Sequence, residues 1–504
     1  MGGMMACLHP YLPYHPEETM TSFVRRLSLF HTGQGPQRLL ADLGINPTDV
    51  HRGAEAALRA LAASSGVEMA TIEKATIGRI ERSRTFRGER WSRDFVKPEG
   101  QRICPHCVVE DTGSGGVHYQ RSQIVWRLRP ISTCAVHHCA LVEVDTTQGD
   151  KELEAPSFSL CELQGLAEQT TTQNPTSLEE WVLAKLSGAL PNGGEWLDGQ
   201  TIEQGVRVCE MLGCVLNDGI HVDLKGMTAA ELRQNALVGF EVAKSGAQSV
   251  TAALDQIRQS SNSQAGQAGP KAMYGKLFEW LAYRNPIVDP GPIKELLREH
   301  ILDHTAIDTG EFLLGREVTK RRCHSVYSLS IATEIHPKRL RKILENRGLI
   351  PEGCAGVALN LLVFPAEETE KFCRELLDTI SLNQLPFEIG GSRTQVTNLH
   401  RDGTINAIIE RDADLGIGRI DFARVEIESF LSKIDKLPLV ETPAETIDLT
   451  SVTKRTGLST GQIMKHVFAG KLAAFRNSDR IGIDSIRVTI ADLWEFKSRM
   501  MAET

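Results

Sequence analysis

The stretch "RICPHCVVEDTGSGGVHYQRSQIVWRLRPISTCAVHHCALVE", residues 102–143, carries two pairs of metal-ligand residues around a basic and aromatic segment. Cys104 and Cys107 form a Cys-x-x-Cys pair, and Cys134 and His137 form a Cys-x-x-His pair, with 26 residues between the two pairs. Each pair can place two ligands on one tight turn, and three thiolates with one imidazole form the tetrahedral set that zinc prefers. The spacing therefore predicts a structural Zn²⁺ site formed by these four residues.

Neighbouring side chains compete for the ligand positions. His106, His138 and Cys139 are alternative ligands, although the x-x spacing favours His137 over His138. A catalytic zinc keeps a position open for water, and four strong protein ligands leave none. Glu110 and Asp111 are therefore expected at the surface or behind the ligands rather than as a general base.

Length and composition set the context of this cysteine-rich stretch. A chain of 504 residues is too long for one ordinary core, so we expect several domains. The eleven cysteines show no disulfide framework, and Cys209 and Cys214 are expected to be helix-face core residues. No apolar run is long enough for a membrane span, and the N-terminal stretch lacks a signal-peptide pattern. These features predict a soluble, cytoplasmic protein without a membrane segment.

Amphipathic helices dominate the rest of the sequence. Residues 177–190, 202–216 and 229–244 have apolar positions at helical spacing, and alternating strand patterns are few. Residues 260–272, "SSNSQAGQAGPKA", contain no large apolar residue and are typical of a flexible linker. The fold class is therefore predicted to be mainly α and multidomain.

The C-terminal half contains a weak internal repeat, in residues 327–350, 380–405 and 447–472. Each copy has a short helix, a turn and a second helix, and a further helix follows each copy; the turn of the first copy is two residues shorter. This order is the helix-turn-helix plan, also found in winged-helix-like units, and Ser392 and Ser459 are expected to cap the second helices. The predicted segments are an N-terminal helical domain with a basic segment (1–100), a zinc finger (101–145), a helical domain (146–259), a linker (260–272), a helical segment (273–325) and three helix-turn-helix-like units (326–379, 380–435 and 445–504).

Basic side chains gather on the outward face of each predicted second helix and around the zinc finger. A net charge of −8 argues against binding nucleic acid through bulk charge, but it does not exclude local basic faces. Units of this shape also serve as protein-docking modules, and the basic residues near the zinc finger would equally suit an acidic partner. The candidate nucleic-acid contacts are Arg87, Arg90, Arg121 and Arg127 near the zinc finger, Lys338, Arg339, Arg341 and Lys342 in the first unit, Arg393, Gln395 and Arg401 in the second, and Lys465 and Lys471 in the third.

Recognisable catalytic signatures are missing from the sequence. There is no Walker loop, dinucleotide-binding glycine motif, Gly-x-Ser-x-Gly elbow or His-Glu-x-x-His motif. A scattered acidic nuclease triad would need a run of strands that is not evident. We therefore expect a binding protein rather than an enzyme.

Two groups of motifs resemble the TniQ family of transposition proteins. The first comprises the Cys104 and Cys134 pairs with Glu110-Asp111, Tyr119-x-Arg121 and Trp126-Arg127-Leu128 between them. The second lies in "PEETMTSFVRRLS", in which Glu18, Ser22, Arg26 and Leu27 match the opening motif of the family. Together these motifs cover roughly the first 145 residues, and the three C-terminal units form an extension of variable character.

The resemblance implies a non-catalytic accessory or target-selection factor of a transposon. Its implied partners are an AAA+ ATPase, a DDE transposase, and target DNA or a ribonucleoprotein such as a CRISPR effector complex, and some members of the family act as homodimers. The residues themselves also allow a second function, that of a sequence-specific transcription regulator that uses the tandem units. A zinc-dependent nuclease or hydrolase is a third function, which the sequence supports least. A transposase and an ATPase encoded nearby would favour the first reading over the second.

Overall fold

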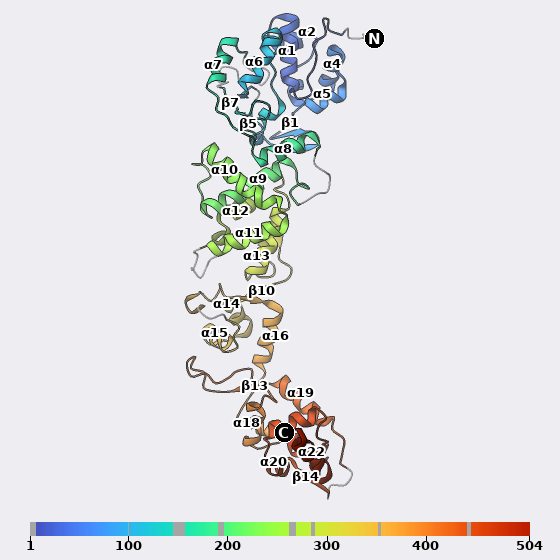
Figure 1. Cartoon of the computed structure of the whole chain (residues 1–504), viewed down its shortest axis with the longest axis vertical. Helices are drawn as coiled ribbons and strands as arrows, with labels where there is room; N and C mark the ends of the chain where they lie inside the picture. Colours follow the sequence, from blue (N-terminus) through green and yellow to red (C-terminus); the bar gives the residue numbers. More distant parts are fainter. Residues whose placement is uncertain are drawn as a thin grey trace. The chain divides into compact units, whose positions relative to one another are not determined.

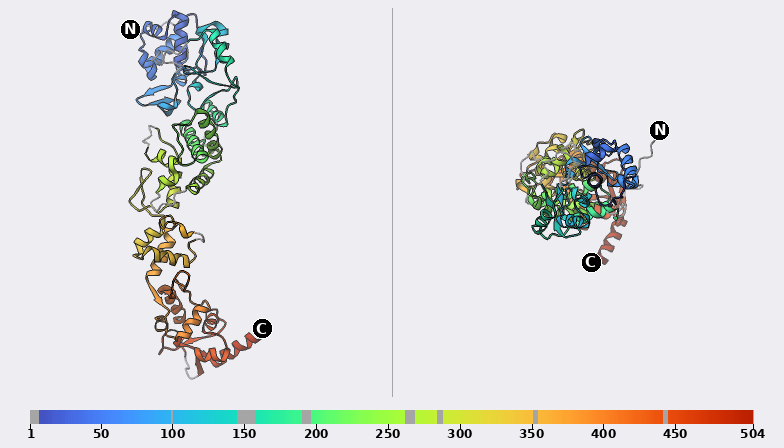
Figure 2. Two further views of the ribbon diagram at one scale, coloured as in Figure 1. Left: turned by 90° about the vertical axis from the view of Figure 1, so that its left-hand side faces the viewer. Right: turned by 90° about the horizontal axis from the view of Figure 1, so that it is seen from above.

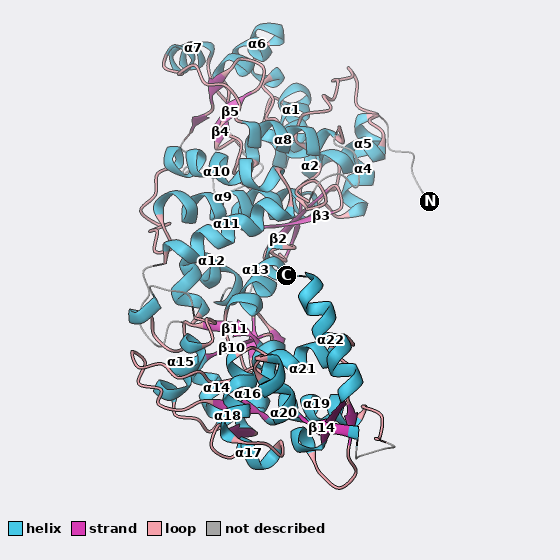
Figure 3. Cartoon of the chain, turned by 60° about the horizontal axis from the view of Figure 1, so that its bottom comes forward, coloured by secondary structure: helices cyan, strands magenta, loops and turns pink. Residues whose placement is uncertain are grey.

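The computed structural model of the chain describes residues 7–98, 100–144, 157–189, 196–261, 269–283, 288–350, 354–440 and 445–503. Helices dominate this part of the chain and the strands are short, which confirms the predicted mainly α-helical fold class (Figure 3). Residue contacts separate two compact units, one reaching His300 and the other beginning at Ile301. Figures 1 and 2 show the elements of each unit. No described helix is both long and apolar enough to cross a bilayer.

The first unit begins with a group of five helices packed around one apolar core. Phe23, Val24 and Leu27 of the first helix are almost completely buried in this core, together with Leu40 and Leu61. The helices are α1 (Met20–Thr32), α2 (Pro36–Asp42), α3 (Pro47–Arg52), α4 (Glu55–Ser65) and α5 (Met69–Ala75).

A small antiparallel sheet follows, in the segment predicted only as a basic part of a helical domain. Its strands are β1 (Gly78–Ile80), β2 (Ser83–Phe86) and β3 (Glu89–Ser92). Trp91 is fully buried, and Arg87 and Gly88 both have positive φ in the turn between β2 and β3. A two-residue turn of this kind suits a tight hairpin because it follows the twist of the strands.

The metal-ligand stretch folds into short strands and one helix, with a helix from beyond it completing the core. Cys104, Cys107 and Cys134 share this small core with Trp126 and Leu163. The elements are β4 (Arg102–Ile103), α6 (Pro105–Gly115), β5 (Thr133–Cys134), β6 (Cys139–Ala140), β7 (Val142–Glu143) and α7 (Leu160–Glu168).

The remaining helices of the first unit include those expected from sequence periodicity. They are α8 (Ser177–Ser187), α9 (Ile202–Asp218), α10 (Ala229–Lys244), α11 (Ala247–Ser260) and α12 (Pro270–Tyr283), followed by α13 (Ile293–His304), in which the unit boundary falls. Cys209 and Cys214 are buried on α9, as expected for core residues. Residues 262–268 of the predicted linker lie outside the described residues, and its ends belong to α11 and α12.

The second unit contains a repeated order of strand, helix, helix, strand and helix. The first and second strands of each repeat pair antiparallel, and the central pairs are His324 with Phe364, Ile380 with Phe422 and Ile447 with Val488. The elements of the three repeats are β10 (Cys323–Ser325), α14 (Val326–Thr333), α15 (Pro337–Asn346), β11 (Val363–Pro365) and α16 (Ala366–Leu377); β12 (Thr379–Ser381), α17 (Leu385–Glu388), α18 (Arg393–Arg401), β13 (Asp421–Ala423) and α19 (Arg424–Asp435); and β14 (Thr446–Asp448), α20 (Leu449–Thr456), α21 (Thr460–Phe468), β16 (Ile486–Thr489) and α22 (Ile490–Glu503), with an extra strand β15 (Phe475–Arg476) beside β16. A short hairpin, β8 (Phe312–Leu313) and β9 (Arg316–Glu317), precedes them.

The hydrophobic cores cross the limits between the repeats. Ile408 and Ile409 of the second repeat pack in the core of the first, around Leu340 and Leu344. The second and third repeats share one core, which contains Phe422, Ile463 and other buried side chains. The repeats therefore stabilise one another, although each keeps its own strand pair.

Candidate metal centre and basic surfaces

Local backbone structure brings the four predicted ligands together. Cys104 is the N-cap of α6 and Cys107 lies in its first turn, which Pro105 begins. Cys134 ends β5, and the chain turns back through His137 to pair Cys134 with Cys139 of β6. His138 has φ of 49°, the left-handed conformation that closes this turn. One helix start and one hairpin turn thus supply two ligands each.

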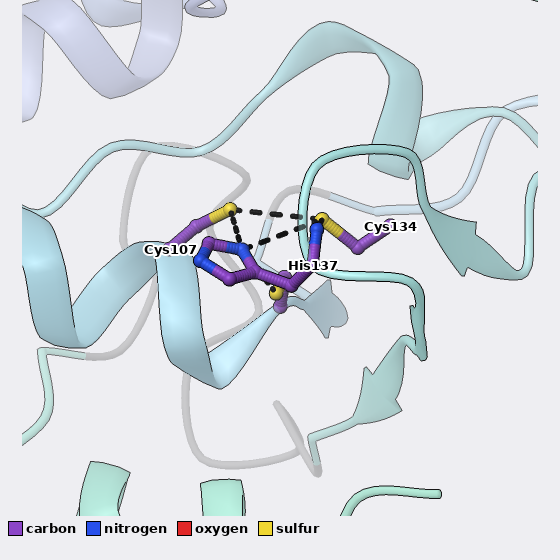
Figure 4. Close-up of side chains that lie close together, drawn as sticks. Cys107, Cys134 and His137 are labelled. Atoms are coloured by element: carbon purple, nitrogen blue, oxygen red, sulfur yellow. Dashed lines mark hydrogen bonds between the residues drawn. The ribbon is translucent and has the colours of Figure 1, made fainter. Parts of the chain in front are cut away.

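The distances between the ligand atoms fit one tetrahedral metal ion. Cys107 Sγ lies 3.7 Å from Cys134 Sγ, and His137 Nδ1 lies 3.6 Å from Cys104 Sγ and 3.2 Å from Cys107 Sγ. Two thiolates bound to one zinc at the tetrahedral angle are about 3.8 Å apart, and a thiolate and an imidazole nitrogen about 3.6 Å. The four side chains form one cluster, with the three cysteines buried and His137 partly exposed. Figure 4 shows the His137 ring nitrogen directed toward the sulfur atoms of Cys107 and Cys134.

The other ring nitrogen of His137 contacts an acidic side chain. Its Nε2 lies 3.0 Å from Glu110 Oε1, so Glu110 can accept a hydrogen bond from the ring while Nδ1 faces the sulfurs. Although burial lowers the pKa of His137, its interactions with Cys134 and Glu110 raise that pKa overall. A carboxylate in this position fixes the tautomer and the orientation of a metal-binding histidine.

Contacts among the cysteines shift the pKa values of their thiols in opposite directions. Hydrogen bonds with Cys104 and Cys107 lower the pKa of Cys134, whereas the hydrogen bond with Cys107 is the main cause that raises the pKa of Cys104. Cys134 is therefore the thiol of the cluster that loses its proton most readily. Metal binding by all three sulfurs must displace the remaining thiol protons, so affinity falls as the pH is lowered.

The competing ligands occupy positions around the cluster. The His106 ring stacks on the His137 ring with centroids 5.4 Å apart, and His138 is exposed. Cys139 Sγ lies 3.7 Å from Cys104 Sγ but does not belong to the group whose atoms all lie close together. The predicted set of Cys104, Cys107, Cys134 and His137 is thus the one that the fold brings together.

Residues 10–141 match the TniQ family model. The match confirms the family resemblance over this segment, which we call the TniQ segment, and indicates a transposition-associated protein. No curated protein matches the chain.

The opening motif of the TniQ segment forms a buried network. Glu18 accepts hydrogen bonds from Ser22 Oγ at 2.8 Å and from Arg26 Nη1 at 2.6 Å, and both charged side chains have no exposed surface. Ser22 Oγ also accepts the backbone N–H of Ser122, and Arg26 Nε donates to the carbonyl oxygen of His118. The motif therefore connects α1 to the chain between the two ligand pairs, a structural role that the sequence did not reveal.

Two arginines predicted as nucleic-acid contacts form hydrogen bonds within the TniQ segment. Arg121 Nε donates to Asp111 Oδ1 at 2.9 Å, while the Asp111 carboxylate also accepts the backbone N–H of Arg121. Arg127 is only 7% exposed, and its Nε donates to the carbonyl oxygen of Lys97. A buried guanidinium cannot reach a phosphate at the surface, so Arg127 is removed from the candidate interface. Arg121 pairs with Asp111 but keeps part of its side chain exposed, so its contact with nucleic acid stays a prediction.

Arg87 and Arg90 lie on the hairpin of β2 and β3. Arg87 Nη1 donates to the carbonyl oxygen of Leu186 at 2.6 Å, and its guanidinium lies over the Phe86 ring. Arg90 Nε donates to Ser83 Oγ at 3.0 Å. Both side chains are exposed, so they remain candidates for contact with a polyanion.

The basic residues of the first repeat divide into buried and exposed sets. Arg341 is half-buried, pairs with Glu345 at 2.8 Å and donates to the carbonyl oxygens of Cys354 and Val357. These contacts stabilise the repeat, and the nucleic-acid contact of Arg341 stays a prediction. Lys338, Arg339 and Lys342 are exposed on α15.

The second helices of the other two repeats pack against each other. Ser392 and Ser459 cap α18 and α21, as predicted, each in a capping box. The carbonyl oxygen of the Gln395 side chain accepts the Ser392 backbone N–H at 2.7 Å, so this oxygen contributes to the cap of the helix. Arg393 remains exposed at the start of α18.

Packing of α18 on α21 brings together cations from two repeats. Gly461 lies so close to α18 that an added Cβ would be 2.7 Å from the carbonyl oxygen of Asn398. Asp402 at the end of α18 bonds to Ser459, the cap of α21. The Ser459 hydrogen bond is the main cause that lowers the pKa of Asp402, and the charges of Arg401 and Lys465 add to it. Arg401 and Lys465 therefore both lie close to the Asp402 carboxylate. Lys471 is exposed just beyond α21.

Proposed function

We propose that this protein is a non-catalytic adaptor of DNA transposition that connects target DNA, or a DNA-bound complex such as a CRISPR effector, to an AAA+ ATPase and a transposase. The match of residues 10–141 to the TniQ family carries the proposal. A bound zinc would stabilise the TniQ segment through Cys104, Cys107, Cys134 and His137, since the donor set and its spacing fit that metal. A four-ligand site of this kind leaves no position for a reacting water.

The second unit supplies the DNA-binding part of this proposal. Helix pairs of the helix-turn-helix type present their second helix to DNA, and the exposed cations Arg393, Arg401, Lys465 and Lys471 lie on or just beyond α18 and α21. Phosphate contacts by lysine and arginine give affinity without sequence preference, and base contacts add specificity. The charge of the complete chain does not prevent this binding because screening limits the reach of distant acidic groups to about 10 Å at ordinary salt.

DNA binding can be tested with the full chain before its partners are known. Repeated selection from a random duplex library would identify a preferred sequence, and the salt dependence of binding would count phosphate contacts. The Arg401→Glu/Lys465→Glu variant should bind the selected duplex more weakly, with a salt slope reduced by about two. The Lys371→Glu/Arg374→Glu variant is the matched control because it makes the same charge change on exposed residues of α16. Equal loss of binding in both variants would contradict the assignment to α18 and α21.

A further inference from the structure

A basic groove lies between α15 of the first repeat and the segment 409–419 of the second. Its volume is about 710 Å³, and α15 contributes Lys338, Arg339 and Lys342 to its lining. Arg419 and Gly418 line it from the second repeat. The segment is held in place because Asp412 and Ile417 bond to each other through their backbones, and Ile409 packs in the core of the first repeat.

The charges of the groove lack acidic partners on α15. In the described part of the chain, the side chains of Lys338 and Lys342 form no hydrogen bond or ion pair, and both are exposed. Arg419 pairs with Asp421 at 2.8 Å, and Arg339 lies near enough to this carboxylate to act against the rise in pKa that burial causes there. One carboxylate therefore faces two arginines, and a net positive charge remains in the groove.

Aliphatic residues distinguish this groove from a surface that binds only phosphates. Ile343, Ile409 and Ile417 contribute to its lining, and among the described lining residues the imidazole of His336 is the one aromatic ring. Bases of single strands bind proteins by stacking on aromatic rings, and duplex DNA presents mostly phosphates and polar base edges. An acidic peptide with an aliphatic side chain satisfies both the cations and the apolar surface.

We infer that this groove is a docking site for an acidic peptide segment of a partner protein, with carboxylates toward Lys338, Arg339, Lys342 and Arg419 and an aliphatic side chain on the isoleucines. The size of the groove suits a few side chains rather than a folded domain. Peptide binding stands on the geometry of the groove, and only the identity of the partner rests on the proposed adaptor function.

Phage display of random 12-residue peptides on the full chain tests the inference. Gly418 offers a blocking variant, because an added Cβ there would meet no atom within 4 Å and the residue does not have positive φ. Selected peptides should be acidic with aliphatic residues, and the Gly418→Leu and Arg339→Glu/Lys342→Glu variants should bind them about tenfold more weakly or worse. The control variant Lys371→Glu/Arg374→Glu should bind them like the parent protein.

The outcomes separate this inference from the proposed function. Failure to select any peptide that depends on Gly418 and Arg339 would overturn the docking site and leave the DNA-binding proposal intact. Loss of duplex binding in the Arg339→Glu/Lys342→Glu variant without such peptides would reassign the groove to DNA. Loss of DNA binding only in the Arg401→Glu/Lys465→Glu variant, with peptide binding unchanged, would support separate sites.

Discussion

At the scale of single residues, the metal-ligand cluster was the most predictable feature of the molecule. Ligand pairs three residues apart specify their own geometry, because one helix start and one hairpin turn suffice to place them. The roles of the arginines were less predictable. A long side chain can bury its guanidinium against backbone carbonyl oxygens, as Arg127 and Arg341 do, and sequence spacing does not distinguish this from an exposed cation.

Replacing Cys107 by Ser should abolish metal binding and destabilise the TniQ segment. Structural zinc contributes about 10 to 16 kcal/mol to small metal-dependent folds, so losing one of four ligands should cost several kcal/mol. Elemental analysis should give about one zinc per parent chain and almost none for the variant. Cys161→Ser is the control because this cysteine is exposed on α7 and lies outside the cluster. Equal zinc content and melting in the parent and the Cys107→Ser variant would contradict the assigned site.

Glu110 should tune metal affinity without being a ligand. Its carboxylate lies 3.0 Å from His137 Nε2, and removal of such a partner lowers metal affinity about 10- to 100-fold. Competition between Glu110→Gln and a calibrated chelator should show this loss, with the zinc still bound at saturation. Glu168→Gln on the exposed face of α7 should compete like the parent protein. A Glu110→Gln variant with parental affinity would limit Glu110 to a surface contact.

The buried carboxyl of Glu18 should make the TniQ segment more stable at lower pH. Burial raises the pKa of Glu18 to about 7, although Arg26 and Ser22 oppose the rise. Because the folded pKa exceeds the unfolded value of about 4.3, the stabilising contribution is complete below that value and is lost as the pH rises through about 7. Glu18→Gln does not titrate, and the metal cluster titrates alike in both proteins.

Hydrogen exchange of α1 in the full chain measures this difference. Between pH 5 and pH 8 the parent should lose about 2 kcal/mol of protection relative to Glu18→Gln, after correction for the intrinsic exchange rates. The opposite trend would mean that the Arg26 ion pair outweighs burial and holds the carboxyl ionised.

At the scale of helices and strands, the sequence predicted helices and their caps well, but it did not predict which helices pack closely together. Periodicity predicted α8, α9 and α10, and Ser392 and Ser459 cap the helices for which they were expected. The short sheet of β1 to β3 was missed although its strands pair across short turns. The packing of α18 on α21 depends on contacts between segments distant in sequence, which spacing alone does not encode. Arg419 was missed for the same reason, since it joins α15 only in the folded chain.

The crossing of α9 and α10 should tolerate no side chain at Gly239. An added Cβ would lie 1.8 Å from the carbonyl oxygen of Cys209, so the helices must move apart in Gly239→Ala. Overpacking of this kind costs about 1 to 3 kcal/mol or more, and thermal melting of the first unit should shift to lower temperature. Gly165→Ala is the matched control, because Gly165 lies in α7 with no atom within 4 Å of an added Cβ. Similar melting of both variants would show that α9 and α10 adjust to the added methyl group.

At the scale of the whole molecule, the two units carry different chemistry. The first contains the TniQ segment and the cysteine–histidine cluster, and the second contains the three repeats with their exposed cations. A protein that binds DNA at one site and a partner at another can act without chemistry of its own. Joining two binding events raises the effective concentration of the second, with avidity gains of about 100- to 10,000-fold.

Reconstituted transposition with the cognate ATPase and transposase should therefore distinguish the contributions of the two units. Arg401→Glu/Lys465→Glu should keep its metal and its melting behaviour but lose targeted insertion, because the transposase is no longer concentrated at the DNA site. Cys107→Ser should also lose insertion, but together with metal and the fold of the TniQ segment, while Lys371→Glu/Arg374→Glu should insert like the parent. Purified protein with magnesium should leave DNA intact in every case. Two results would contradict the adaptor function. One is metal-dependent DNA cleavage by the protein alone, which would make it an enzyme. The other is insertion whose frequency and position stay the same when the protein is omitted, because the transposase would then reach its target without an adaptor.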